Sequence, residues 1–96
     1  MMQPLNTDDI QTRLDQLNPA WALVGGSSLE REYEFSDFKT GLAFVNEVGD
    51  IAVQHQHHPD ITLSWGKVTV SLTSHDAGGL TSKDFEFAQS LDALAV

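Results

Sequence analysis

Three histidines in two short segments are the residues of this sequence best suited to chemistry. His57 and His58 precede Pro59, and His75 follows 17 residues after His58 in the segment Thr73-Ser74-His75-Asp76. The residues between the two segments alternate apolar and polar side chains, as in a β-hairpin, which would bring the segments together. Histidine has an unperturbed pKa of about 6.5 and exchanges protons near neutral pH. The sequence therefore predicts a cluster of imidazoles.

These residues alone leave three interpretations open. Histidines are common at helix ends, where a protonated imidazole favours the negative end of the helix dipole, and His55 could have that role. The three histidines could instead catalyse proton transfer. Together with His55 they could also bind a metal, because imidazole binds zinc, copper, iron and nickel. Against a metal, the chain has no cysteine, and Asp60 and Asp76 are the only acidic residues close by.

Composition excludes several other classes of protein. The 96 residues suffice for one core, and we expect a single domain over residues 1–96. Without cysteine the chain has no disulfide and no thiolate nucleophile. The formal net charge of -9 argues against nucleic-acid binding, which needs basic side chains at the phosphates. The N-terminus lacks signal-peptide features and no apolar run approaches the ~20 residues of a membrane helix, so we expect a cytoplasmic protein with no membrane partner.

Apolar periodicity and capping residues predict seven elements. Asn6 and Thr81 are expected N-caps, each with an aspartate three residues later, and Ser36 is the expected cap of the middle helix. Two glycines weaken the middle helix, and Arg31 on the apolar side of a strand is unexplained. The expected helices cover residues 7–17, 37–54 and 82–96, and the expected strands cover residues 21–24, 29–35, 61–65 and 68–73, with turns at Gly25-Gly26-Ser27 and Gly66-Lys67.

The order of these elements predicts an α+β fold. A four-stranded antiparallel sheet with three helices on one face, in the order α-β-β-α-β-β-α, is the simplest architecture that buries every apolar stripe. Pro59 ends the helix before the hairpin, and Gly78-Gly79 allows a sharp turn after His75. The histidines thus lie at junctions between elements, where a rigid scaffold can display catalytic side chains.

Taken together, these residues resemble the pterin-4a-carbinolamine dehydratase family, whose members are also called 4a-hydroxytetrahydrobiopterin dehydratases. The motif consists of His57-His58-Pro59, then Trp65 after five further residues, His75-Asp76 after nine more, and finally Gly78-Gly79-Leu80-Thr81 and Asp84. Phe35, Phe38, Phe44 and Val48 resemble the family's second helix and its approach. The similarity covers about residues 4–94.

The resemblance implies an active site without cofactor or metal that removes water from a 4a-hydroxytetrahydropterin. The product is the quinonoid dihydropterin, so the reaction recycles the cofactor of aromatic amino-acid hydroxylases. An acid assists the departure of the C4a hydroxyl as water, and a base accepts the N5 proton. By resemblance, His57 and His75 transfer these protons, and His58 holds the ring and shares that work. The residues expected to bind the substrate are Gln56, Pro59, Thr73, Ser74, Asp76 and Lys83.

Departures from the family pattern bear on efficiency and on the preferred pterin. Gln56 and Val53 occupy positions where members often carry acidic residues, which would orient the histidines and raise their pKa. Lys83 replaces an arginine that many members carry, so a point charge replaces a bidentate fork. Trp65-Gly66 replaces the commoner Tyr-Asn.

The resemblance also implies partners. Family members form dimers and tetramers, so we expect a homodimer or a homotetramer. An aromatic amino-acid hydroxylase or another protein client is a candidate partner. Some relatives act as dimerisation cofactors of transcription factors, and others look like assembly chaperones of a carbon-fixing enzyme. The alternative function is therefore a non-catalytic binding, assembly or dimerisation-cofactor protein on the same fold.

Overall fold

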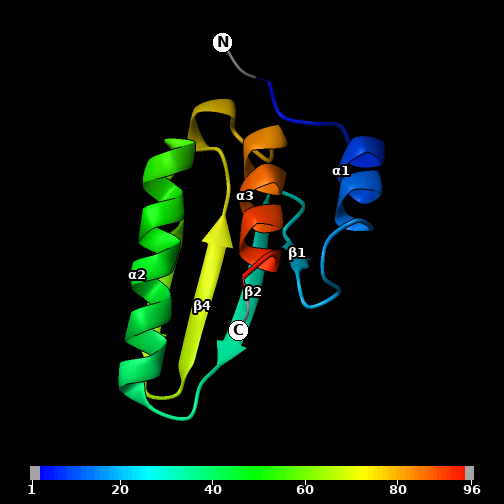
Figure 1. Cartoon of the computed structure of the whole chain (residues 1–96). Coiled ribbons are helices and arrows are strands. Elements are labelled where there is room, and N and C mark those ends of the chain that lie inside the picture. The colour runs from blue at the N-terminus through cyan, green and yellow to red at the C-terminus, as the bar shows by residue number, and fades with distance from the viewer. Residues whose placement is uncertain (1–2, 95–96) are drawn as a thin grey trace.

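The computed structural model describes residues 3–94, which form three helices packed on a four-stranded sheet (Figure 1). Neighbouring strands are antiparallel, in the order β1-β2-β4-β3. The helices are α1 (Thr7–Leu14), α2 (Phe38–His55) and α3 (Ser82–Asp92); the strands are β1 (Ala22–Val24), β2 (Ser28–Glu34), β3 (Asp60–Ser64) and β4 (Lys67–Leu72); and a 3-10 turn, η1 (His75–Ala77), links β4 to α3. The predicted α+β class and element order are confirmed.

Side chains alternate along the strands between the core and solvent. On β2, Leu29 and Tyr33 are buried whereas Glu32 is exposed. The register pairs Leu29 with Leu72 and Tyr33 with Val68 of β4. Apolar side chains of the two central strands therefore lie on one face of the sheet, as their period of two requires.

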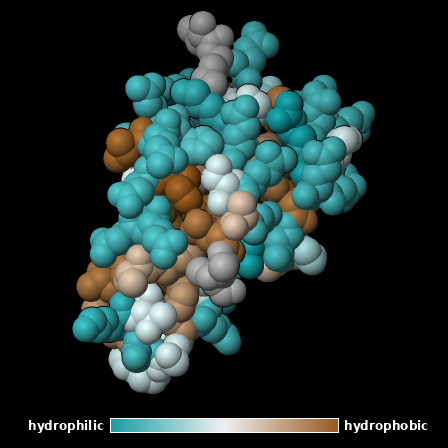
Figure 2. All heavy atoms as spheres, in the orientation of Figure 1, coloured by the Kyte–Doolittle hydropathy of each residue, from teal (hydrophilic) through white to brown (hydrophobic). Residues whose placement is uncertain are grey.

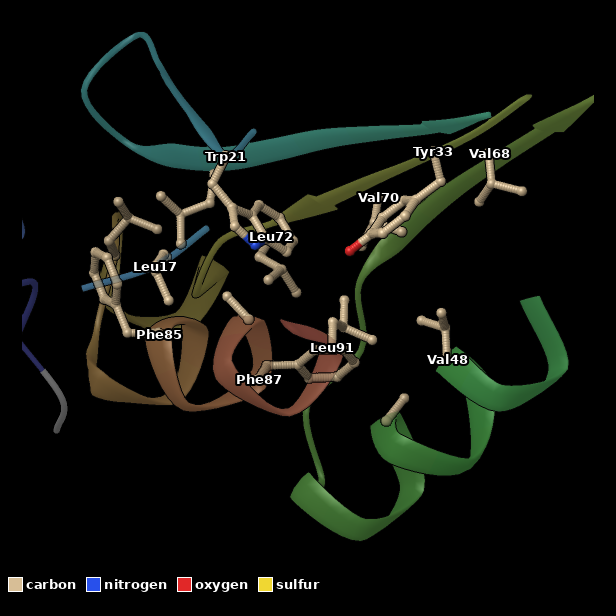
Figure 3. Close-up of a cluster of buried hydrophobic side chains, with 14 of the residues drawn as sticks. Leu17, Trp21, Tyr33, Val48, Val68, Val70, Leu72, Phe85, Phe87 and Leu91 are labelled. Carbon is tan, nitrogen blue, oxygen red and sulfur yellow. The ribbon is translucent and has the colours of Figure 1, made fainter. Parts of the chain in front are cut away.

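Helices α2 and α3 cover this apolar face. In Figure 3, Val48 of α2 and Leu91 of α3 are among the side chains that fill the space between the helices and the sheet. Ile10 of α1 belongs to the same buried cluster. Burial of shared apolar surface, worth about 25 cal/mol per Å² removed from water, thus fixes the helices on the sheet.

Two helix boundaries differ from the prediction. The cap of α2 is Asp37, whose carboxylate accepts a hydrogen bond from Thr40 N at 2.8 Å, so the expected cap Ser36 was wrong. Serine and aspartate suit this position equally well, and a shift of one residue cannot be read from their types. Helix α1 ends at Leu14 rather than Leu17, because the amides of Gln16 and Leu17 donate to carbonyls three residues earlier and tighten the chain. Leu17 remains buried in the turn that follows.

The strand ends are displaced by one residue at most, and the hairpin turn is Trp65-Gly66 rather than Gly66-Lys67. Ser64 pairs with Lys67, and Gly66 adopts a φ of 75°, which glycine tolerates without steric cost. Helix α3 ends at Asp92, so its expected continuation through residues 93–94 was wrong. Residues 95–96 of the expected helix lie outside the described part of the chain.

Helix α2 continues through both glycines. Gly41 is buried where α2 crosses the sheet, and a Cβ added there would lie 3.2 Å from Leu63 Cδ1 and 3.5 Å from Val68 Cγ2. The glycine therefore allows the helix to approach the sheet closely, which offsets its low helix propensity.

Arg31 belongs to a polar cluster that joins β2 to the end of α3. Its Nη1 donates a hydrogen bond to Asp92 Oδ1 at 2.8 Å, and Trp21 Nε1 donates to the same oxygen at 2.8 Å. The guanidinium carbon lies 4.4 Å from the centroid of the Tyr33 ring. The charge of Arg31, which the alternation of apolar and polar residues did not explain, is thus paired with a carboxylate and stacked on an aromatic ring.

We expect Tyr33→Phe to leave the free energy of unfolding at pH 7 unchanged or to raise it by up to about 1 kcal/mol. Tyr33 Oη is buried and has no hydrogen-bond partner among the described residues, and burial raises the pKa of Tyr33 to about 12. Because the unfolded chain loses this proton near pH 10, stability should fall between about pH 10 and pH 12 in the wild type and fall less in the variant. Urea unfolding at neutral and alkaline pH measures both effects. A loss of more than about 2 kcal/mol at pH 7 would show that the hydroxyl is bonded.

Candidate active site

A cleft opens where α2 finishes, β4 ends and α3 begins. It has a volume of about 210 Å³ and is open to solvent. Its lining residues are Gln56, His57, His58, Thr73, Ser74, His75, Asp76 and Lys83. The two histidine segments therefore meet, as the hairpin between them predicted.

The end of α2 gives its adjacent histidines different environments. Gln56 caps the helix in the left-handed conformation, with a φ of 51°, and His57 N donates to Ala52 O at 3.2 Å. This closure of the last helical turn satisfies carbonyls that would otherwise lack partners. The side chain of His57 is mostly buried whereas His58 is exposed. His57 is therefore the histidine that the protein interior can orient.

A buried carboxylate holds His57. Nε2 of His57 lies 2.5 Å from Oδ1 of Asp84, a residue of the first turn of α3 whose side chain is fully buried. Because a carboxylate accepts hydrogen bonds, Nε2 carries the proton in this pair. Nδ1 is then the ring nitrogen left to accept a proton, or to donate one from the imidazolium form. Asp84 thus fixes both the orientation and the tautomer of the imidazole.

Asp84 is in turn fixed by neighbouring donors. Its Oδ2 accepts hydrogen bonds from Ser74 Oγ at 2.8 Å and from Thr81 N at 2.9 Å. Ser74 Oγ also lies 2.8 Å from Thr81 Oγ1. A buried carboxylate without such partners would be strongly destabilising. The network therefore joins the end of β4, the start of α3 and His57 into one rigid unit.

His75 lies on a short closed loop. Ser74 and Gly79 form an isolated antiparallel bridge at its base, with Ser74 N donating to Gly79 O at 3.1 Å and Gly79 N donating to Ser74 O at 3.3 Å. Between them the turn η1 carries His75, and Gly78 closes the turn with a φ of 74°. The loop exposes His75 at the cleft that the end of α2 also lines.

Eight of the nine residues predicted for the site line the cleft. Pro59 is not among them and instead leads the chain into β3. Gln56, Asp76 and Lys83 are exposed, so they are available to a ligand without rearrangement of the core. The roles of these residues remain predictions.

Asp84 is the candidate functional residue that the sequence did not assign to the site. Its spacing from Thr81 predicted a capping box, which the structure contains. Its contact with His57, 27 residues earlier, depends on how the end of α2 packs against the start of α3. Val53 and Gln56 deprive α2 of acidic side chains at this end, and α3 supplies a carboxylate to His57 instead.

His55 is not part of the cleft lining. Its Nε2 lies 2.9 Å from Ser90 Oγ, and its ring centroid lies 5.4 Å from that of Phe87. Within residues 3–94, no three histidine, aspartate or glutamate side chains are grouped so that they could hold a metal ion. The arrangement of four histidines considered as a metal site therefore does not occur in the described part of the chain.

Trp65 lies far from the cleft, at the opposite end of the sheet. It occupies the turn between β3 and β4 and is 75% exposed. In the view of Figure 2, hydrophilic side chains predominate at the upper end, where η1 joins α3 in Figure 1, and hydrophobic surface is visible lower, between α2 and α3. The cleft and the exposed tryptophan therefore occupy separate ends of the molecule.

The fold and the cleft define a class of protein: an α+β scaffold that displays three histidines, one of them paired with a buried carboxylate, in an open site suited to acid–base chemistry. The sequence profile of the family "Pterin 4 alpha carbinolamine dehydratase" matches residues 3–94. The chain therefore belongs to this family.

Individual relatives agree with the family assignment. The chain is 46% identical over 96 residues to a protein of Thermosynechococcus vestitus, covering 100% of this chain and 99% of the relative. It is 42% identical over 89 residues to a protein of Alkaliphilus metalliredigens, covering 93% and 80% of the two chains. Both relatives carry the name "Putative pterin-4-alpha-carbinolamine dehydratase".

Two solved structures share the fold. The transcriptional coactivator/pterin dehydratase from Brucella melitensis superposes with a TM-score of 0.89 at 27% identity, covering 98% of this chain and all of that one. A pterin dehydratase-like protein identified as a RuBisCO assembly factor in the alpha-carboxysome superposes with a TM-score of 0.64 at 21% identity, covering 77% and 87% of the chains. At that identity the second likeness concerns the fold alone.

Proposed function

We propose that this protein is a 4a-hydroxytetrahydrobiopterin dehydratase that works by histidine acid–base catalysis. The observation that carries the proposal is the convergence of His57, His58 and His75 on one cleft. Family membership supplies the substrate class, a 4a-hydroxytetrahydropterin. The reaction regenerates a quinonoid dihydropterin and so serves the recycling of the cofactor of aromatic amino-acid hydroxylases.

The proposed reaction needs one acid and one base. The C4a–O bond breaks as the hydroxyl accepts a proton and leaves as water, and the N5–H bond breaks as its proton passes to a base, so that a C4a–N5 double bond forms. His57 and His75, which both line the cleft, perform these two transfers, and His58 holds the ring and shares the work. The carboxylate of Asp84 supports the role of His57, because it leaves Nδ1 free and stabilises the imidazolium after proton uptake.

Exposed polar residues of the cleft are the proposed contacts for the rest of the pterin. Asp76 and Lys83 offer an acceptor and a donor of opposite charge, and Gln56 offers an amide that can both donate and accept. These groups match the amide and amino edges of a pterin ring. Their exposure suits a small substrate that enters and leaves an open cleft.

A second candidate function is a non-catalytic binding or assembly role on the same fold. The observation that favours it is the row of apolar side chains left exposed on α2: Phe38 and Leu42 are about half exposed and Val53 is 74% exposed. One of the structural relatives is named as both a coactivator and a dehydratase, so the two roles can share a fold. Within the described residues no helix is long and apolar enough to cross a membrane; a cytoplasmic location is our proposal.

A stopped-flow assay tests the proposed function. 4a-Hydroxytetrahydropterin is generated in the instrument, and its dehydration is followed with and without the protein. We expect catalysed loss of the intermediate, unchanged after dialysis against a chelator. Failure of the protein to accelerate the reaction would favour the binding role, and activity that is lost to the chelator and restored by zinc would favour a metal site.

We expect the protein to form a homodimer or a homotetramer. Its small core, the exposed side chains of α2 and the edge strands of the sheet all favour association. The net charge of -9 opposes it, but a screening length of about 8 Å at physiological salt confines this repulsion to near neighbours. Light scattering at micromolar concentration should give a multiple of 10.5 kDa, with Leu42→Lys lowering the mass if the α2 surface takes part. A 10.5 kDa particle for the wild type would refute the expectation without bearing on catalysis.

A further inference from the structure

The segment before α1 crosses the base of the loop that carries His75. In Figure 1 this segment runs from the N-terminal end past the start of α3 to α1. Leu5 N donates a hydrogen bond to Leu80 O at 2.8 Å, and the Leu5 side chain packs against the core cluster. Asn6 then caps α1 by accepting from Asp9 N at 2.8 Å. The segment is therefore tied at both ends: to the residue after Gly79 and to its own helix.

Pro4 lies directly against Gly79. A Cβ added to Gly79 would lie 3.8 Å from Pro4 Cγ, an ordinary contact, but only 3.1 Å from Pro4 Cβ, which is tighter than most Cβ contacts. Gly79 is not among the residues with positive φ, so its backbone does not demand glycine. The close approach of Pro4 therefore accounts for the missing side chain at this position.

Gly79 is also half of the bridge that closes the His75 loop. Its amide and carbonyl both bond to Ser74, and Ser74 Oγ donates to Asp84, the partner of His57. Pro4 thus packs against the Ser74–Gly79 bridge, and through Ser74 this bridge joins the His75 loop to the hydrogen-bond network of His57. Inside the loop, Ala77 N donates to Ser74 O at 3.0 Å and Gly78 N donates to His75 O at 3.1 Å, whereas the side chains of His75 and Asp76 are exposed to solvent.

We propose that Pro4 and Leu5 form a strap that positions the His75 loop, with Gly79 as its docking point. This inference rests on the proposed dehydratase function for its catalytic consequence. The base of the loop is closed by only two main-chain hydrogen bonds, so it can open locally at low cost. The Pro4 side chain, packed against Gly79, limits this opening and so narrows the range of positions that His75 can take. Since misplacing a catalytic group by about 1 Å can cost roughly 10²-fold in rate, a distant contact of this kind affects turnover. Pro4, Leu5 and Gly79 are positioning residues and do not touch the substrate.

Two substitutions and their combination test the strap by steady-state kinetics. Pro4→Gly removes the atoms that contact Gly79, and Gly79→Ala pushes them away; we expect each to lower kcat roughly threefold to tenfold with KM changed less than about twofold. In the double variant the added methyl group has no Pro4 side chain to displace. Its kcat should therefore equal that of Pro4→Gly rather than fall by the product of the two losses. Gly49→Ala is the matched control, because a Cβ there meets nothing within 4 Å, and its kcat should stay at the wild-type value.

Amide hydrogen exchange gives a readout that does not depend on activity. In Pro4→Gly, the amides of Ser74 and Gly79 should exchange several-fold faster than in the wild type, whereas amides of β4 should not change. An active wild type with Pro4→Gly and Gly79→Ala at full kcat, or with multiplied losses in the double variant, would overturn the strap. Unchanged exchange at Ser74 and Gly79 would overturn it as well, even if the wild type proved inactive. A lack of wild-type activity with faster exchange would reject the dehydratase and keep the strap.

Discussion

Replacing His57 or His75 with alanine is expected to lower turnover of a 4a-hydroxytetrahydropterin by roughly 10²-fold or more, the usual contribution of a positioned acid or base. Each variant removes one of the two proposed proton-transfer groups while the other remains on its own element. His75 is exposed, so its loss should leave the free energy of unfolding nearly unchanged. His57 is mostly buried against Asp84, so its loss should also destabilise the fold by about 1–3 kcal/mol. Stopped-flow rates and urea unfolding of the same preparations separate the two effects.

His55→Ala is the matched control for these substitutions. It removes an imidazole from the end of the same helix but from outside the cleft, where it contacts Ser90. Turnover should remain within about twofold of the wild type, because no acid–base group of the cleft is removed. Wild-type activity in His57→Ala and His75→Ala would show that the histidines are not the catalytic groups, whatever the behaviour of His55→Ala.

Substitutions of Asp84 should have the second largest effect, and their two consequences can be separated. Asp84→Ala leaves His57, Ser74 and Thr81 N without their acceptor in a buried site, which should cost about 2–4 kcal/mol of stability. Asp84→Asn keeps the shape and one oxygen, so it should cost less stability. However, its amide nitrogen can face Nε2 of His57, which must then accept a hydrogen bond and move its proton to Nδ1. We therefore expect Asp84→Asn to lower kcat about tenfold to hundredfold, out of proportion to its effect on stability.

The informative comparison is between Asp84→Asn and the capping variant Thr81→Ala. Thr81 caps α3 and touches the same network, yet it does not contact His57. Loss of the cap should cost about 1 kcal/mol of stability with a much smaller loss of kcat. Equal losses of kcat in the two variants would mean that Asp84 acts only by holding α3. Nitrogen chemical shifts of His57 in Asp84→Asn would report the expected change of tautomer directly.

Local signals in the sequence were sufficient for the architecture. The alternation of apolar residues on β2 and β4, the N-cap Asn6 and the capping box at Thr81 each depend on neighbours within a few residues. Such signals define elements and, through the hairpin, the meeting of His57 with His75. The errors were equally local: Ser36 and Asp37 are both good caps, and only the last turn of α1 tightened.

Contacts between distant segments were not predictable in the same way. The acceptor for Arg31 is Asp92, 61 residues later, and the acceptor for His57 is Asp84, 27 residues later. In both cases the sequence shows on which element the polar side chain lies, but it does not show which other element packs against that side chain. The reason for Gly79 is similarly hidden, because Pro4 lies 75 positions away in the sequence and only the folded chain brings the two together.

The two tryptophans are placed so that intrinsic fluorescence can report separately on the core and on the hairpin end. Trp21 is 4% exposed and its indole is bonded to Asp92, whereas Trp65 is 75% exposed at the far hairpin turn. Indole fluorescence depends strongly on contact with water, so the two residues emit from different environments in the native state. A Trp65→Phe background would leave a single emitter in the core, whose red shift reports unfolding without any label. An acrylamide quencher would reach Trp65 but not Trp21. A decrease in the quenching of the wild-type fluorescence would therefore reveal any partner or second copy that covers the hairpin end.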